Sequence, residues 1–131
     1  MDDRVLDTLK YDAQGLIPAI VVDADSGEVL MMAYMNRNCL AESIHTGRTH
    51  FWSRSRQKYW MKGESSGHTQ EIQEILVDCD MDTVLIRVKQ HGAACHNGYK
   101  SCFYRRLQSD GSWQVIAERV FDPEKVYGKK E

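Results

Sequence analysis

The chain has 131 residues, and its net charge of −2 argues against general nucleic-acid binding. No apolar run approaches the roughly 20 residues of a membrane span, and the charged residues 1–12 lack the apolar core of a signal peptide. We therefore expect one domain over residues 1–131, no membrane partner and a cytoplasmic location, where the four cysteines stay reduced.

The first elements in chain order are a hairpin and a helix. Residues 17–24 and 28–35 are apolar runs on either side of an Asp-Ser-Gly turn, which predicts a β-hairpin. Asn36 is a suitable N-cap for a short helix that would continue to about Thr46 and stop at Gly47.

The rest of the chain predicts further strands, because it is rich in aromatic and β-branched residues. The expected strands cover residues 48–54, 57–62, 72–79, 83–90, 102–108 and 113–120, the last two on either side of an Asp-Gly turn. The sum is an α+β fold, mainly β, with antiparallel or mixed sheets and one or two short helices.

Charges of opposite sign are separated along the chain. Between Glu42 and Glu64 the charged residues are all basic: Arg48, Arg54, Arg56, Lys58 and Lys62. Between Gln70 and Arg87 they are all acidic: Glu71, Glu74, Asp78, Asp80 and Asp82. The first segment suits an anion and the second a cation, and the alternative is two solvated strand faces.

Three aspartates alternate with other residues at Asp78, Asp80 and Asp82. If this segment is extended, the three carboxylates share one face about 7 Å apart, and a divalent cation would relieve their repulsion. An EF-hand loop is excluded, because Thr83 and Lys89 occupy the positions that need Gly and an acid. The remaining readings are a magnesium site and an exposed acidic turn.

Three thiols fall in or near the same region, at Cys79, Cys95 and Cys102. Soft thiolates suit zinc, and three without a fourth sulfur indicate an ion with an open coordination position, as in catalytic sites. The spacing matches no zinc finger, and free cysteines are often small buried apolar residues, which is how we interpret Cys39. His96, beside the second thiol, is a candidate zinc ligand, proton carrier or turn residue. Of the other histidines, only His68 follows a notable motif.

A basic segment follows the predicted helix. In an extended strand, Arg54 and Arg56 share one face and could grip a phosphate through charge-assisted hydrogen bonds. The next residues offer Lys62, Ser65 and Ser66 between two glycines, although no Walker motif is present. The alternative is an ordinary amphipathic hairpin.

Several motifs together resemble the phosphoribosyl-AMP cyclohydrolase family of histidine biosynthesis. The segments that resemble it are GLIPAIVVDADSGEVLMMAYMN, FWSRSR, WMKGESSG, DCDMD and GAACHNGYKSCF, in this order over residues 15–106. The resemblance implies an enzyme whose two identical chains form an intertwined homodimer. It implies zinc on Cys79 of one chain and on Cys95 and Cys102 of the other, and magnesium on the three aspartates. Some members of the family have a downstream pyrophosphohydrolase domain, and we expect the monofunctional form here.

The implied reaction is hydrolytic opening of the purine ring of phosphoribosyl-AMP at the N1–C6 bond. Its two phosphates suit Arg54, Arg56, Lys62, Ser65 and Ser66, and His96 is the candidate for proton transfer. Zinc would lower the pKa of a water toward about 7. Two alternatives remain: a zinc nucleobase deaminase, whose H-x-E and P-C-x-x-C motifs are missing here, and a non-catalytic module in which metal ties two subunits together.

Overall fold

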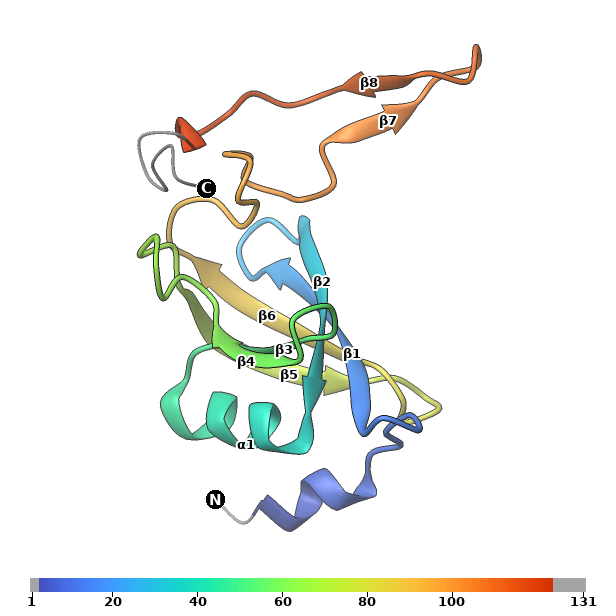
Figure 1. The fold of residues 1–131 in the computed structure, drawn as a ribbon, viewed down its shortest axis with the longest axis vertical. Helices are drawn as coiled ribbons and strands as arrows, with labels where there is room; N and C mark the ends of the chain where they lie inside the picture. Colours follow the sequence, from blue (N-terminus) through green and yellow to red (C-terminus); the bar gives the residue numbers. More distant parts are fainter. Residues whose placement is uncertain (1–2, 124–131) are drawn as a thin grey trace.

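A six-stranded sheet forms the body of the molecule (Figure 1). The structure is a computed structural model that describes residues 3–123. In chain order the elements are η1 (Asp3–Thr8), β1 (Leu16–Asp23), β2 (Val29–Asn36), α1 (Arg37–Thr46), β3 (His50–Ser53), β4 (Lys58–Met61), β5 (Gln70–Val77), β6 (Val84–Gln90), β7 (Arg105–Leu107) and β8 (Trp113–Val115). The predicted fold class, mainly β with few short helices, is confirmed.

The sheet has the strand order β4-β3-β2-β1-β6-β5. Every neighbouring pair is antiparallel except β1 and β6, which run parallel from Ala19 opposite Val84 to Asp23 opposite Val88, so the sheet is mixed. It curls until the start of β5 reaches the start of β3, where Ile72 N donates to Gly47 O at 2.8 Å. The core lies under α1, where Ile17, Met35, Leu40, Phe51 and Ile86 are almost completely buried.

The predicted hairpin and helix near the N-terminus are confirmed. The Asn36 side chain accepts a hydrogen bond from Cys39 N at 2.8 Å and so satisfies an unpaired amide of the first helical turn. Gly47 ends the helix with φ of 76°, a left-handed conformation that other residues adopt only with strain. The short helix η1 was not predicted. It packs against α1, with Arg37 Nε 2.5 Å from Asp7 Oδ1.

Two predicted strands end earlier than expected. Residues 78–83 form a turn between β5 and β6, and residues 54–57 form a turn between β3 and β4. The extended conformation that we assumed for residues 77–83 and 52–58 is therefore wrong. In each case polar side chains bond to nearby amides and stabilise the turn: Asp78 in the first and Ser53 in the second.

Residues 91–104, which we call the thiol loop, follow β6 and cross over the end of the β1–β2 hairpin. Ser101 Oγ donates to Val29 O at 2.6 Å, and Cys102 N donates to Leu30 O at 2.6 Å. Lys100 Nζ lies 3.0 Å from Asp23 Oδ2 and 3.2 Å from Glu28 Oε1. These contacts attach the loop to the hairpin.

The last two strands form an arm that stands away from the sheet (Figure 1). The predicted hairpin around Asp110 and Gly111 is confirmed, but each strand has only three residues. Its apolar side chains are largely exposed, with Leu107 at 61% and Trp113 at 65%. No helix within residues 3–123 is long and apolar enough to cross a membrane.

Candidate active site

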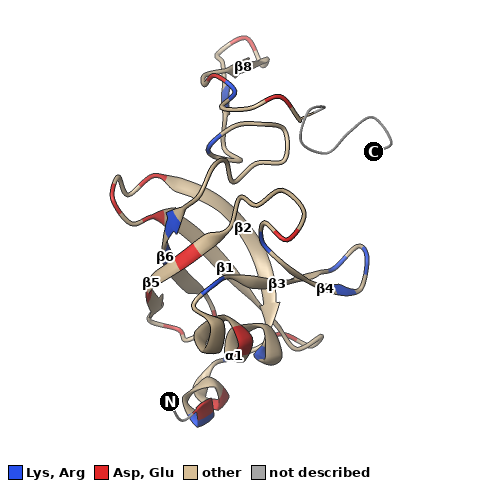
Figure 2. Cartoon of the chain, turned by 90° about the vertical axis from the view of Figure 1, so that its left-hand side faces the viewer, with Lys and Arg blue, Asp and Glu red and all other residues tan. Residues whose placement is uncertain are grey.

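One cavity of about 520 Å³ collects most of the predicted substrate-binding residues. Arg56, Lys62, Ser65, Ser66 and His96 all line it. They come from the β3–β4 turn, the segment after β4 and the thiol loop, so residues forty positions apart in the sequence meet here. Figure 2 shows Lys and Arg in the turn between β3 and β4, at the basic side of this cavity.

Arg54 does not line this cavity. Because β3 ends at Ser53, the chain turns and sends Arg54 and Arg56 in different directions instead of along one strand face. The Arg54 guanidinium lies 3.9 Å from the centre of the Tyr34 ring, a cation–π contact. Arg54 lines a neighbouring cavity of about 320 Å³, and Trp52 borders both cavities.

Aromatic residues that the sequence analysis did not select form part of the main cavity. Tyr34, Trp52 and Trp60 lie on the adjacent strands β2, β3 and β4, and Tyr34 pairs directly with Trp52. Such rings can stack on a purine base. The sequence carried a signal, because Trp52 and Trp60 both lie in predicted strands next to the basic residues, but we interpreted them only as strand formers.

Two of the three predicted zinc ligands are adjacent. The thiols of Cys95 and Cys102 lie within hydrogen-bonding reach of each other in the thiol loop. Although Cys102 as a residue is exposed, partial burial of its thiol and the neighbouring Cys95 raise the pKa of Cys102 to about 11. Without a metal this group is a neutral thiol near pH 7, and a metal that binds it must displace the proton.

The third predicted ligand lies at the opposite end of β6. Cys79 is exposed in the β5–β6 turn, whereas Cys95 follows the other end of that strand (Figure 1). The seven residues of β6 span roughly 20 Å. A zinc–sulfur bond is only about 2.3 Å long, so one chain in this conformation cannot bring all three thiols to one ion. Cys39 belongs to α1, and its side chain is fully buried in the core.

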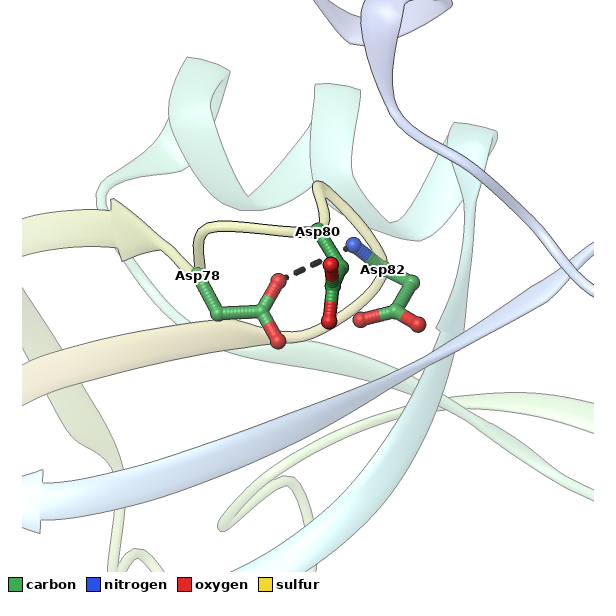
Figure 3. Close-up of side chains that lie close together, drawn as sticks. All are labelled: Asp78, Asp80 and Asp82. Atoms are coloured by element: carbon green, nitrogen blue, oxygen red, sulfur yellow. Dashed lines mark hydrogen bonds between the residues drawn. The ribbon is translucent and has the colours of Figure 1, made fainter.

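The three aspartates form the only group of three or more His, Cys, Asp or Glu side chains within residues 3–123 that lie close enough together to hold a metal ion. Their nearest oxygens all lie within 4.8 Å of one another, closer than an extended strand would allow (Figure 3). Asp78 Oδ1 accepts hydrogen bonds from Asp82 N at 3.1 Å and Thr83 N at 3.3 Å. Met81, with φ of 64°, lets the turn close.

This crowding has opposite effects on the acidity of two of these carboxyl groups. Partial desolvation acts to raise the pKa of Asp78, but hydrogen bonds from Asp82 and Thr83 outweigh it, and the pKa is lowered. The pKa of Asp82 is raised, first by its hydrogen bond with Asp78 and then by desolvation and the negative charge of Asp78. A divalent cation would favour the ionised form of both groups, and carboxylate oxygens are the ligands that magnesium prefers.

Lys62 lies at the junction of the cavity and the thiol loop. Its Nζ donates a hydrogen bond to the carbonyl of Ala94, the residue before Cys95. Burial lowers the pKa of Lys62, and the nearby Cys102 and Cys95 act in the opposite direction. We predicted Lys62 as a phosphate ligand; it lines the main cavity, and its amine also contacts the loop that holds the thiol pair.

His68 was the one other histidine with a possible role. Its ring meets Phe121 edge to face with centroids 4.7 Å apart, and it packs against Gly92. A Cβ at Gly92 would lie 2.5 Å from that ring. His68 does not line the main cavity, and this packing holds the start of the thiol loop.

The chain is similar to known proteins over nearly its full length. A family model described as phosphoribosyl-AMP cyclohydrolase matches residues 31–104, which include the three predicted zinc ligands, the three aspartates and every residue that lines the main cavity. A phosphoribosyl-AMP cyclohydrolase of Pelotomaculum thermopropionicum is 61% identical over 125 residues, 95% of this chain and 97% of the relative. Proteins of the same name from Methanococcoides burtonii and Chlorobium phaeovibrioides are 57% identical (93% and 98% covered) and 55% identical (99% and 95% covered). The chain belongs to the phosphoribosyl-AMP cyclohydrolase family.

Proposed function

We propose that this enzyme opens the purine ring of phosphoribosyl-AMP by zinc-dependent hydrolysis of the N1–C6 bond, a step of histidine biosynthesis. Its membership of the family supports the overall reaction. The observation that carries the proposal is a single cavity lined by basic residues, aromatic residues and His96. Lys62, in the same cavity, contacts the loop that holds the thiol pair.

The cavity suits a nucleotide. Arg56, Lys58, Ser65 and Ser66 offer charged and hydroxyl donors to a phosphate, and an arginine can form two parallel bonds to it. Tyr34, Trp52 and Trp60 offer apolar faces to the purine. The neighbouring cavity that contains Arg54 is the candidate place for the second phosphate, because it shares Trp52 with the first.

The proposed reaction adds water across the N1–C6 bond. The substituent on N1 withdraws electrons from the ring, so C6 is more electrophilic and N1 is a better leaving group. Oxygen bonds to C6, the N1–C6 bond breaks, N1 takes a proton, and the original amino group remains as part of a carboxamide. His96 lines the cavity with an exposed side chain, and we assign to it the transfer of that proton.

The residues present fit zinc. Cys95 and Cys102 supply two adjacent soft donors, and Cys79 of the partner subunit would supply the third, since Cys79 of the same chain is too distant. The functional unit is then a homodimer with two shared sites. When bound, zinc supplies a water of lowered pKa as the nucleophile.

The three aspartates fit magnesium through their clustered oxygens, and they flank Cys79. In a shared site they would lie beside the thiol pair and cavity of the other chain. There the ion would hold a substrate phosphate or orient the substrate.

An assay that follows purine absorbance and ammonia together tests the proposed reaction. We expect ring opening with no release of ammonia, and loss of turnover when zinc is removed. Ammonia released in proportion to turnover would indicate a deaminase. Retained zinc with no turnover would indicate a non-catalytic module.

We expect Arg56→Ala to raise KM for phosphoribosyl-AMP roughly tenfold with little change in kcat, because a charged hydrogen bond to phosphate is about equally strong in ground and transition states. Steady-state kinetics measure this. Arg106→Ala, on the exposed arm, is the matched control and should leave KM unchanged. A fall in kcat alone would point away from phosphate binding.

We expect Asp80→Asn to weaken magnesium binding and to shift the magnesium dependence of activity to higher concentrations, while zinc content stays normal. Calorimetric titration and activity against free magnesium measure the two effects. The control is Asp110→Asn, in the turn of the arm, where the carboxylate accepts a bond from Ser112 N. Normal magnesium dependence in Asp80→Asn would identify the cluster as a solvated turn.

A further inference from the structure

Lys62 differs from the other basic residues of the cavity in what its side chain contacts. Its backbone is fixed, because Lys62 N donates to Thr49 O at 3.1 Å at the end of β4. Its amine reaches across to the thiol loop and donates to Ala94 O. Lys58 and Arg56 line the same cavity but are exposed.

The carbonyl that Lys62 contacts belongs to a constrained part of the loop. Ala94 is almost completely buried, and its own N–H donates to Lys100 O at 2.9 Å. Cys95 N donates to Tyr99 O at 3.1 Å. The contact from Lys62 therefore holds Ala94, the residue next to Cys95, from the cavity side.

The position of Lys62 also has an electrostatic consequence. Three thiolates around a zinc ion would carry a net charge of −1, and a partly buried ammonium group nearby would offset part of that charge, because water screens charges less well there than on the open surface. Cys102 and Cys95 lie close enough to Lys62 for their charges to act on the pKa of its amine.

We propose that Lys62 is a positioning residue of the zinc site, which holds the carbonyl of Ala94 and balances the thiolate charge. This inference rests on the proposed zinc-dependent function. It differs from a phosphate-binding role, because it predicts an effect on the metal with no substrate present.

The test measures metal affinity of the purified full-length protein without substrate. Zinc is titrated in competition with a chromogenic chelator, and Co²⁺ is titrated by its thiolate charge-transfer absorption. We expect Lys62→Met to weaken binding of both metals by about 10- to 100-fold, the usual effect of losing a group that supports metal ligands. Lys62→Arg, which keeps the charge and the donor, should recover most of the affinity.

Lys58→Met is the matched control, since it removes an exposed lysine of the same cavity, and it should bind both metals like wild type. Thermal melting of the metal-free proteins fixes a temperature at which all are folded. Unchanged affinity in Lys62→Met, or equal weakening in Lys62→Arg, would overturn the proposal. If the wild-type protein binds no zinc at its thiols, the proposed function itself fails.

Discussion

Cys79→Ser and Cys102→Ser proteins are each expected to be inactive alone and to regain activity as heterodimers. If the zinc sites are shared, one site of the heterodimer is intact. It combines Cys79 of the Cys102→Ser chain with Cys95 and Cys102 of the Cys79→Ser chain. The second position lacks two ligands. Activity per heterodimer should be roughly half that of wild type if the two sites act independently. The physical basis is the separation of Cys79 from the thiol pair by the length of β6.

Heterodimers are obtained by co-expression with two affinity tags, and zinc and turnover are measured on the doubly purified species. A mixture of Cys95→Ser with Cys102→Ser is the control. Both changes affect the same half of a site, so every site in that heterodimer lacks at least one ligand. Confirmed heterodimers of the first pair with neither zinc nor turnover would show that the ligands come from a single chain.

Cys95→Ser is expected to remove zinc and to reduce kcat/KM by at least about 10³-fold, because metal catalysis contributes several kcal/mol and each 1.36 kcal/mol is a factor of ten. Cys39→Ser is the control. That residue belongs to α1, where its side chain is fully buried in the core and burial raises the pKa of its thiol, so we expect it to bind no metal. Cys39→Ser should keep zinc and activity at some cost in stability. Metal analysis and steady-state kinetics decide the result, and a fully active Cys95→Ser protein would refute the zinc site.

The local elements were predictable from short-range signals. Asn36 and Gly47 mark the two ends of α1. Asparagine readily caps a helix with its side chain, and glycine readily adopts the left-handed conformation that ends one. The Asp-Ser-Gly and Asp-Gly turns likewise gave two hairpins at the expected places. Within the cavity, Arg56, Ser65, Ser66 and His96 do lie together, although their roles stay predictions.

The predictions that were wrong assumed that a segment stays extended. The alternation argument placed Arg54 with Arg56, but Ser53 and Gln57 stabilise a turn that separates them. It also spaced the aspartates along a strand, whereas backbone amides bonded to Asp78 draw them together. Whether such a segment forms a strand or a turn depends on competition between side-chain and backbone hydrogen bonds. The alternation of residues along the sequence does not reveal the outcome of that competition.

Long-range placement was also beyond the sequence. The strand predicted over residues 83–90 does lie between Cys79 and the other two thiols, but only its pairing with β1 and β5 shows that it runs straight and keeps them apart. The contact of Lys62 with Ala94 is of the same kind, since thirty-two positions separate the two residues.

The length of β6 has a consequence for how the enzyme would behave on dilution. If a complete zinc site needs two chains, a newly synthesised polypeptide is inert until it meets a second copy. Specific activity would then fall as the protein concentration drops below the dissociation constant of the dimer, and added Cys95→Ser chains, inactive alone, would raise it again because each still supplies Cys79 to a wild-type partner. The rate of encounter between chains, rather than the folding of each, would set when catalysis begins.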